Sequence, residues 1–311
     1  MERGTISIIL SVGILLLGLS ICPLQVDGQD KRVVVGGKNF TEQYILAGMA
    51  KVLLERNDFD VALQTGVGTA VARRALLNDQ IDMYYEYTGT AYTVFYKGAD
   101  RDMMTDGEAV YKWIKKQDAE KGLIWLDQVK FNNTYTLMMR EDQAEKLDIE
   151  TIGDLARYIN ENPDKLVIGV NAEFWERPDG FKPLMSHYGF QVLYGKVRKM
   201  DSGLVYKALR DGNVDVSMGF ATDGRIEAFG FTTLEDDKDY FPVYSPVLVI
   251  RKEVIDKYPE IETILKPIAD KLTTQQMRQL NAAVDVRHKD VEAVAREWIE
   301  KHAPQTSSGN K

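Results

Sequence analysis

The chain has 311 residues, of which 44% are apolar and 28% are charged, and its formal net charge is −8. This length and composition are typical of a soluble globular protein that forms two domains of ordinary size. The negative charge, together with the lack of a basic run or basic amphipathic helix, argues against nucleic acid or an anionic membrane as a partner.

The first residues are interpreted as a targeting segment. An apolar run at residues 6–19 follows Arg3 and is too short and too weakly flanked for a typical membrane span. Cleavage after Gly28 would remove residues 1–28 as a signal peptide and release the protein into the periplasm or another extracytoplasmic space. Alternatively, residues 19–22 resemble a bacterial lipoprotein box, with Cys22 as the lipidated residue. An uncleaved N-terminal anchor helix is the third possibility.

The chain contains one cysteine, Cys22. Cleavage after Gly28 would therefore leave a mature chain without any. That outcome excludes disulfides, thiolate catalysis and cysteine metal sites.

From residue 32 onward, strand and helix patterns alternate. We expect a buried strand at 32–36, a helix with its apolar face at 45–53 and a second strand at 59–65. A helix follows at 70–78, with Thr69 as its cap. It leads through a polar turn into a short apolar strand at 81–84 and an aromatic, hydroxyl-rich turn.

A later stretch resembles this helix, turn and strand. Residues 208–216 align without gaps on residues 75–83, which lie 133 positions earlier. Continuing the alignment places Phe220 on Tyr87 and Asp223 on Thr90. Each unit thus presents an aromatic residue just past a strand end, where open α/β sheets bind ligands. The alternative is that two helix–turn–strand units look alike by chance.

The remaining patterns predict an α/β fold of two lobes. A second strand–helix series covers residues 166–218, and helices are expected over residues 255–302. Two long extended connections, near 130–139 and 239–249, predict a pair of crossing strands between the lobes. Lobe I would comprise residues 29–130 and 239–311, and lobe II residues 131–238.

Four aromatic residues border the predicted cleft: Tyr87 and Phe220 at strand ends, and Tyr135 and Tyr244 in the crossing connections. An aromatic box suits a quaternary ammonium group, which carries positive charge but has no N–H donors. Ring faces attract such a cation at roughly 0.5–2 kcal/mol per desolvated ring. The competing interpretation is that these are ordinary core aromatics.

Polar residues near the same cleft suit the other end of a zwitterion. Lys38 follows one strand end, and Arg177 lies in the loop after another. Arg holds a carboxylate with two hydrogen bonds and Lys acts as a point charge, while Thr90 adds a hydroxyl. Taken singly, the two cations could also be solvated surface charges.

The sequence gives little support for catalysis. The three histidines, at 187, 288 and 302, have no metal-ligand spacing, and no nucleophile elbow or zinc-protease motif is present. No cofactor is expected. Glu86, beside Tyr87, is more simply explained as a carboxylate that caps a helix or forms a salt bridge than as a general base.

Four motifs resemble those of the substrate-binding proteins of osmoprotectant ABC transporters, which bind glycine betaine, proline betaine, carnitine or choline. They are KNFTEQ at 38–43, EYTGT at 86–90, RPDG at 177–180 and TDGRI at 222–226. The resemblance implies a type II periplasmic-binding-protein fold with a tyrosine cage around the ammonium group. By this resemblance Tyr87, Tyr135 and Tyr244 are cage residues. Phe220 stands where the family commonly has tyrosine.

The same resemblance assigns the carboxylate end to Lys38, Thr90 and Arg177 and places Asn133 beside the cage. It implies a monomeric receptor, not an enzyme, that delivers its ligand to ABC permease subunits in the membrane. Glycine betaine is the expected ligand, and Thr90 in place of an acid argues against a choline-only protein.

Two alternatives remain open at this point. One is a binding protein for another small zwitterion or an amino acid, which would need a buried acid to receive ammonium N–H groups. The other is an exported two-lobed enzyme that uses Glu86 and Arg177 on a small anion.

Overall fold

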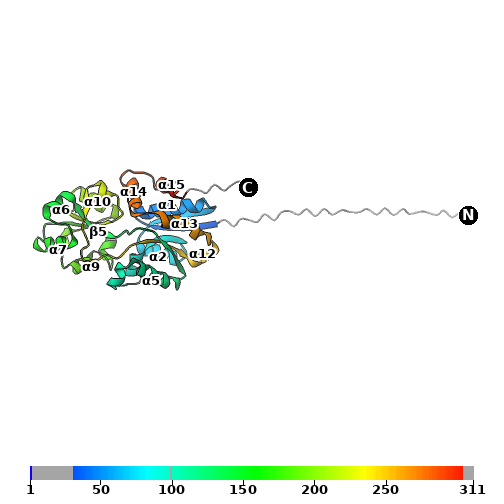
Figure 1. Cartoon of the computed structure of the whole chain (residues 1–311), viewed down its shortest axis with the longest axis horizontal. Coiled ribbons are helices and arrows are strands. Elements are labelled where there is room, and N and C mark those ends of the chain that lie inside the picture. Colours follow the sequence, from blue (N-terminus) through cyan, green and yellow to red (C-terminus); the bar gives the residue numbers. More distant parts are fainter. Residues whose placement is uncertain (2–30, 99, 304–311) are drawn as a thin grey trace. The chain divides into compact units, whose positions relative to one another are not determined.

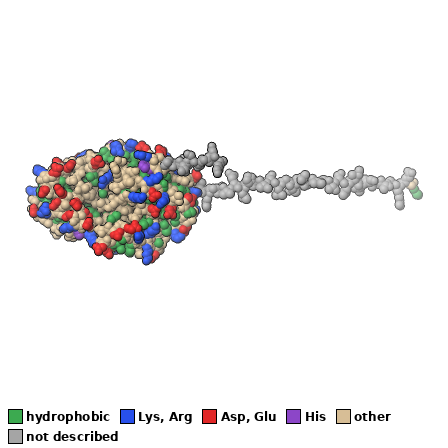
Figure 2. Space-filling view, viewed as in Figure 1, with side chains coloured by type: hydrophobic (Ala, Val, Ile, Leu, Met, Phe, Trp, Pro, Cys, Tyr) green, Lys and Arg blue, Asp and Glu red, His purple; other side chains and the backbone are tan. Residues whose placement is uncertain are grey.

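The computed structural model describes Met1, residues 31–98 and residues 100–303 (Figure 1). Apart from Met1, the predicted signal-peptide segment, with its cleavage site at Gly28 and the alternative lipid site at Cys22, lies outside the described residues. Within the described ranges, no helix has the length and apolarity that a membrane crossing requires. On the face drawn in Figure 2, Lys and Arg side chains are interspersed with Asp and Glu.

The first lobe is built on a five-stranded sheet with the order β2-β1-β3-β10-β4. Strand β1 is parallel to β2 and β3, whereas β10 is antiparallel to β3 and β4. The strands are β1 (Lys31–Lys38), β2 (Phe59–Val67), β3 (Met83–Tyr87), β4 (Leu123–Gln128) and β10 (Pro246–Arg251). The sheet therefore combines the first part of the chain with one strand from far downstream.

The second lobe contains a sheet of the same design, with the order β7-β6-β8-β5-β9. Strand β6 is parallel to β7 and β8, and β5 is antiparallel to β8 and β9. The strands are β5 (Tyr135–Arg140), β6 (Ile168–Val170), β7 (Val197–Lys199), β8 (Val216–Phe220) and β9 (Phe231–Thr233). Both sheets place one antiparallel strand next to the central parallel strand.

The predicted repeat is confirmed as a structural one. Asp82 precedes β3 and accepts a hydrogen bond from the Val34 N–H at 2.6 Å. Asp215 precedes β8 and accepts one from the Val167 N–H at 2.8 Å. The two aspartates are aligned partners in the sequence repeat, and each ties its central strand to the neighbouring parallel strand.

Helices cover both faces of the first sheet, because side chains alternate along its strands. In β3, Met83 and Tyr85 belong to a core that α1, α13, α14 and α15 complete, while Tyr84 belongs to another core with α2 and α5 (Figure 1). The helices of this lobe are α1 (Thr41–Glu55), α2 (Thr69–Leu77), α3 (Thr88–Thr90), the π-helix η1 (Ala91–Phe95), α4 (Arg101–Thr105), α5 (Gly107–Ala119), α12 (Lys252–Lys257), α13 (Glu260–Lys271), α14 (Thr274–Asp285) and α15 (Val291–His302).

The second sheet has a core of its own, which extends to Tyr87 at the end of β3 and to Tyr244 just before β10. Its helices are α6 (Glu141–Leu147), α7 (Ile152–Glu161), α8 (Ala172–Glu176), α9 (Phe181–Tyr188), the 3-10 helix η2 (Tyr194–Lys196), α10 (Ser202–Arg210) and α11 (Arg225–Ala228). The α/β fold with two lobes is thus as the sequence predicted.

Two extended segments, residues 129–134 and 241–245, connect the lobes side by side. The Val129 N–H donates to the Pro246 carbonyl at 2.8 Å, and the Asn133 N–H donates to the Tyr244 carbonyl at 3.0 Å. These segments fall within the predicted crossing connections at 130–139 and 239–249. We keep the predicted lobe boundaries, 29–130 with 239–311 and 131–238, as a proposal.

Candidate ligand-binding site between the lobes

One pocket between the lobes brings together all eight residues that the sequence singled out. They are Lys38, Tyr87, Thr90, Asn133, Tyr135, Arg177, Phe220 and Tyr244. The same pocket is lined by six further residues: Asn39, Phe40, Thr69, Asn171, Glu173 and Ser202. Its empty space, including solvent at the open mouth, is about 450 Å³.

The strand ends place these side chains. Lys38 ends β1, Tyr87 ends β3 and Phe220 ends β8, so the carboxyl ends of parallel strands from both sheets face the pocket. Tyr135 begins β5 and pairs directly with Phe220. Tyr244 lies in the second crossing segment, just before β10.

Five aromatic rings form a continuous row along the pocket. Their order is Tyr87, Phe40, Phe220, Tyr135 and Tyr244, with successive ring centroids 6.1, 5.3, 5.1 and 5.6 Å apart. The first two rings come from the first lobe and the next two from the second. Phe40 was missed as a site residue, although it lies inside the KNFTEQ motif.

Buried carboxylates fix the two outer tyrosines. The Tyr87 hydroxyl donates to Glu42 Oε1 at 2.7 Å, and the Tyr244 hydroxyl donates to Asp179 Oδ2 at 2.6 Å. A buried tyrosine with a bonded hydroxyl has a defined ring orientation. The faces of these rings are therefore held in place before any ligand arrives.

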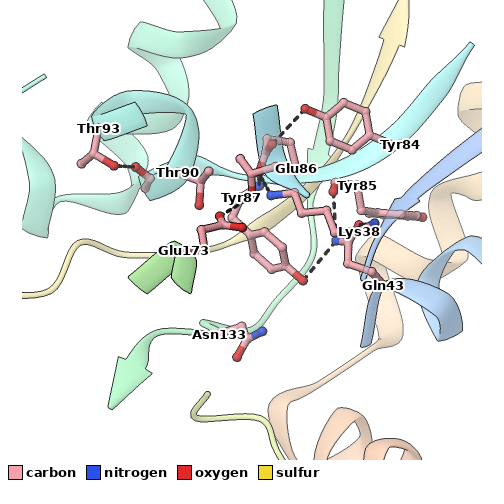
Figure 3. A network of polar contacts seen from close by, with 12 residues as sticks. Lys38, Gln43, Tyr84, Tyr85, Glu86, Tyr87, Thr90, Thr93, Asn133 and Glu173 are labelled. Carbon is pink, nitrogen blue, oxygen red and sulfur yellow. Dashed lines mark hydrogen bonds and ion pairs between the residues drawn. The ribbon is translucent and has the colours of Figure 1, made fainter. Parts of the chain in front are cut away.

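The two cations of the pocket already have carboxylate partners. Lys38 Nζ forms a buried ion pair with Glu86 (Figure 3). Arg177 binds Asp179 with two hydrogen bonds, Nε to Oδ1 at 2.7 Å and Nη2 to Oδ2 at 2.6 Å. Burial opposes ionisation of Asp179, but Arg177 outweighs it and keeps the pKa of Asp179 below its ordinary value.

The charged groups of Lys38 and Arg177 also lie close to the aromatic rings. Lys38 Nζ is 5.0 Å from the Tyr87 ring centroid. Arg177 Cζ is 5.3 Å from the Tyr135 centroid and 5.9 Å from the Tyr244 centroid. These distances are within cation–π range, so the ring faces of this pocket already stabilise positive charge.

Glu173, on α8, is a charged residue that the sequence reading missed. Its Oε1 accepts a hydrogen bond from the Thr69 hydroxyl at 2.6 Å and lies 3.3 Å from Arg177 Nη1. Burial favours the neutral acid, but Arg177 and Lys38 outweigh it and lower the pKa of Glu173. The prediction that Thr69 caps α2 was wrong, because Gly68 is the N-cap and the Thr69 hydroxyl reaches the second lobe instead.

A polar cluster behind the rings also joins the lobes. Glu42 on α1 contacts Thr222, which follows β8, and the Thr222 Oγ1 to Glu42 Oε2 distance is 2.6 Å. The Asn133 side-chain amide donates to Glu42 Oε1 at 2.9 Å. Burial raises the pKa of Glu42 to about 7, against the opposing effect of these hydrogen bonds.

None of the histidines lines this pocket, and the described part of the chain holds no group of His, Cys, Asp and Glu suited to a metal ion. Glu86, the imagined general base, is engaged with Lys38 and also accepts a hydrogen bond from the Tyr84 hydroxyl at 2.8 Å. A two-lobed α/β structure with an aromatic pocket between its lobes is typical of solute-binding proteins.

Comparison with known proteins assigns the family. Residues 31–301 match the model of the substrate-binding domain of ABC-type glycine betaine transport systems. The chain belongs to this family, and it is a transport binding protein and not an enzyme.

Individual relatives agree with this assignment. The chain is 38% identical over 279 residues to a glycine-betaine-binding protein of Pseudomonas aeruginosa, covering 88% of this chain and 89% of that protein. It is 32% identical over 298 residues to the carnitine transport binding protein OpuCC of Listeria monocytogenes, covering 92% of each. A solved structure of a glycine betaine/carnitine/choline ABC transporter protein superimposes with a TM-score of 0.70 at 30% identity, covering 87% of this chain and 98% of that one.

Proposed function

We propose that this protein captures a quaternary ammonium osmoprotectant, glycine betaine first among them, between its lobes. The observation that carries the proposal is the row of five rings from Tyr87 to Tyr244. A trimethylammonium group cannot donate an N–H hydrogen bond, so ring faces are the protein surface that suits it. Three desolvated rings at roughly 0.5–2 kcal/mol each would supply a large part of the approximately −8 kcal/mol of a micromolar complex.

The polar side of the pocket is proposed to hold the carboxylate. Lys38 has ammonium protons beyond the one used by Glu86. Arg177 Nη2 donates one proton to Asp179 and the other to the Thr90 hydroxyl oxygen, at 3.3 Å. The Thr90 hydroxyl proton is therefore the donor that this pair offers to a ligand carboxylate. Asn133 is proposed to act indirectly, because its amide is bonded to Glu42 behind the Tyr87 ring.

Ligand capture is proposed to couple to a hinge motion of the two crossing segments. Hydrogen bonds between Thr69 and Glu173 and between Glu42 and Thr222 join the lobes. A closed receptor of this kind would then deliver its ligand to the permease subunits of the ABC importer.

Binding proteins of ABC importers are extracytoplasmic. For this chain we propose export by a signal peptide at residues 1–28 and a monomeric receptor in the mature form. Lipid anchoring through Cys22 is the alternative route to the same side of the membrane.

One observation favours a second candidate, a binding protein for an ordinary amino acid. Glu173 places a carboxylate in the pocket, and such a group could receive ammonium N–H bonds. Glycine and glycine betaine separate the two candidates, because they differ only in the three methyl groups on nitrogen.

Calorimetric titration of the purified protein with glycine betaine, carnitine, choline and glycine tests the proposal. We expect binding of the methylated zwitterions and no binding of glycine. Tyr135→Leu should weaken glycine betaine binding by about tenfold or more. Tyr194→Leu, at a fully exposed position, is the control. Binding of glycine alone would replace the proposal with the amino-acid candidate.

A further inference from the structure

The charges around the pocket do not balance. Among the residues that line it, Lys38, Glu173 and Arg177 are charged. Glu86 forms an ion pair with Lys38, and Asp179 forms one with Arg177, so both cations are neutralised. This group therefore contains two cations and three carboxylates. Of the three carboxylates, Glu173 lines the pocket.

Glu173 is held in an ionised and partly accessible state. Its side chain is 36% exposed, against 4% for Arg177 and 0% for Asp179. Both of its described polar contacts fall on one oxygen: the Thr69 hydroxyl and one Arg177 nitrogen converge on Oε1. Oε2 has no hydrogen-bond partner among the described residues. Figure 3 draws this side chain in the polar network that also contains Thr90 and Tyr87.

Resting on the proposed quaternary ammonium function, we propose that Glu173 sets the ligand preference of the site. It narrows the advantage of ligands whose far end is a bare carboxylate, such as glycine betaine, over ligands that carry a net positive charge or a hydrogen-bond donor there. Glycine betaine and choline represent the two kinds of ligand. They share the trimethylammonium group and differ at the far end, carboxylate against hydroxyl.

The geometry gives the reason for each half of the preference. A ligand carboxylate that accepts the second proton of Arg177 Nη1 lies next to Glu173, which accepts the first, and the two negative charges repel each other. A hydroxyl can instead donate to the open oxygen of Glu173. The net positive charge of choline is also attracted by the third carboxylate, because Glu86 and Asp179 already neutralise Lys38 and Arg177.

The test is Glu173→Gln, which keeps the size and an acceptor oxygen for Thr69 and removes the charge. We expect glycine betaine to bind more tightly to this variant and choline to bind more weakly. The ratio of their dissociation constants should change by about tenfold or more, a change that corresponds to only about 1.4 kcal/mol. Isothermal titration calorimetry of both ligands on the parent and the variant measures it.

Two control variants separate charge from other effects. Glu176→Gln removes a charge from the same helix at a side chain that is 63% exposed and bonded to Lys182, so both affinities should stay as in the parent. Thr69→Ala removes the hydrogen bond between the lobes without changing any charge. It should weaken both ligands by the same factor and leave their ratio unchanged.

The possible outcomes are distinct. Opposite shifts of the two affinities in Glu173→Gln support the proposal. If the affinities of both ligands for Glu173→Gln fall by the same factor, or do not change, the proposed role of Glu173 is overturned. The proposed function is then left intact, because both ligands still bind the parent protein. If the parent binds neither methylated ligand, the proposed function fails and this proposal fails with it.

Discussion

The buried carboxyl group of Glu42 makes the stability of the protein depend on pH. Three contacts join Glu42, Thr222 and Asn133 in a ring: Asn133 Nδ2 donates to Glu42 Oε1, and Thr222 Oγ1 lies 2.6 Å from Glu42 Oε2 and 2.8 Å from Asn133 Oδ1. Thr222 has one hydroxyl proton and can donate to only one of these oxygens. If Glu42 Oε2 carries a proton and donates it to Thr222 Oγ1, the Thr222 hydroxyl can donate its own proton to Asn133 Oδ1. Both contacts are then hydrogen bonds. The geometry and the raised pKa therefore agree.

The size of the effect follows from the two pKa values. Burial raises the pKa of Glu42 from its ordinary 4.5 to about 7. Between these values the folded protein holds a proton that the unfolded chain has released, so the free energy of unfolding falls as the pH rises. At about 1.4 kcal/mol per pH unit, the loss attributable to Glu42 is about 3 kcal/mol and is complete above pH 7.

Glu42→Gln removes this dependence. Glutamine can accept from Tyr87 and Asn133 through its oxygen and donate to Thr222 through its nitrogen, as the protonated acid does. Relative to the parent, the variant should gain about 2.5 kcal/mol of unfolding free energy between pH 5 and pH 8, because part of the loss in the parent has occurred by pH 5. Urea unfolding followed by tryptophan fluorescence at both pH values gives this difference.

Other buried carboxyl groups with a shifted pKa, such as Asp285, whose pKa burial raises, are common to both proteins and cancel in the comparison. Glu55→Gln, at the end of the same helix, is the matched control and should show no pH-dependent gain. A stability difference between Glu42→Gln and the parent that is the same at both pH values would refute the reasoning.

Three further predictions concern other parts of the molecule. Asp118→Asn should cost about 3–5 kcal/mol of unfolding free energy by leaving the buried Arg73 without its carboxylate, as chemical denaturation will show. Gly224→Ala should cost about 1–3 kcal/mol, since a Cβ there would lie 2.4 Å from the Ala282 Cβ, and the change in unfolding midpoint measures it. Phe220→Tyr should leave glycine betaine affinity in calorimetry within about threefold, because cation–π attraction arises from the ring face; a loss of a hundredfold would show that the missing hydroxyl matters here.

Much of the fold was accessible from the sequence because its signals are local. The repeat at 75–83 and 208–216 combines helix periodicity, a polar turn and an apolar strand start, and these features identify corresponding positions in two sheets. The same alignment placed Tyr87 and Phe220 at equivalent strand ends, and both line the pocket.

The electrostatics of the pocket were not accessible in the same way. The sequence predicts Lys38 and Arg177 as available cations, because the motifs themselves do not state that Glu86 and Asp179 form ion pairs with them. Arg177 and Asp179 are two residues apart, so the pair could have been suspected from spacing. The Thr69–Glu173 contact joins residues 104 positions apart, and only the fold brings them together.

The most direct test of the account compares glycine betaine with 3,3-dimethylbutanoate in calorimetric titrations of the parent protein. The two ligands share shape, methyl groups and carboxylate, and differ in the positive charge on the central atom. The account predicts that glycine betaine binds about a hundredfold more tightly or better, since at least three rings lose their cation. Equal affinities would contradict it and show that the ring row recognises methyl groups alone.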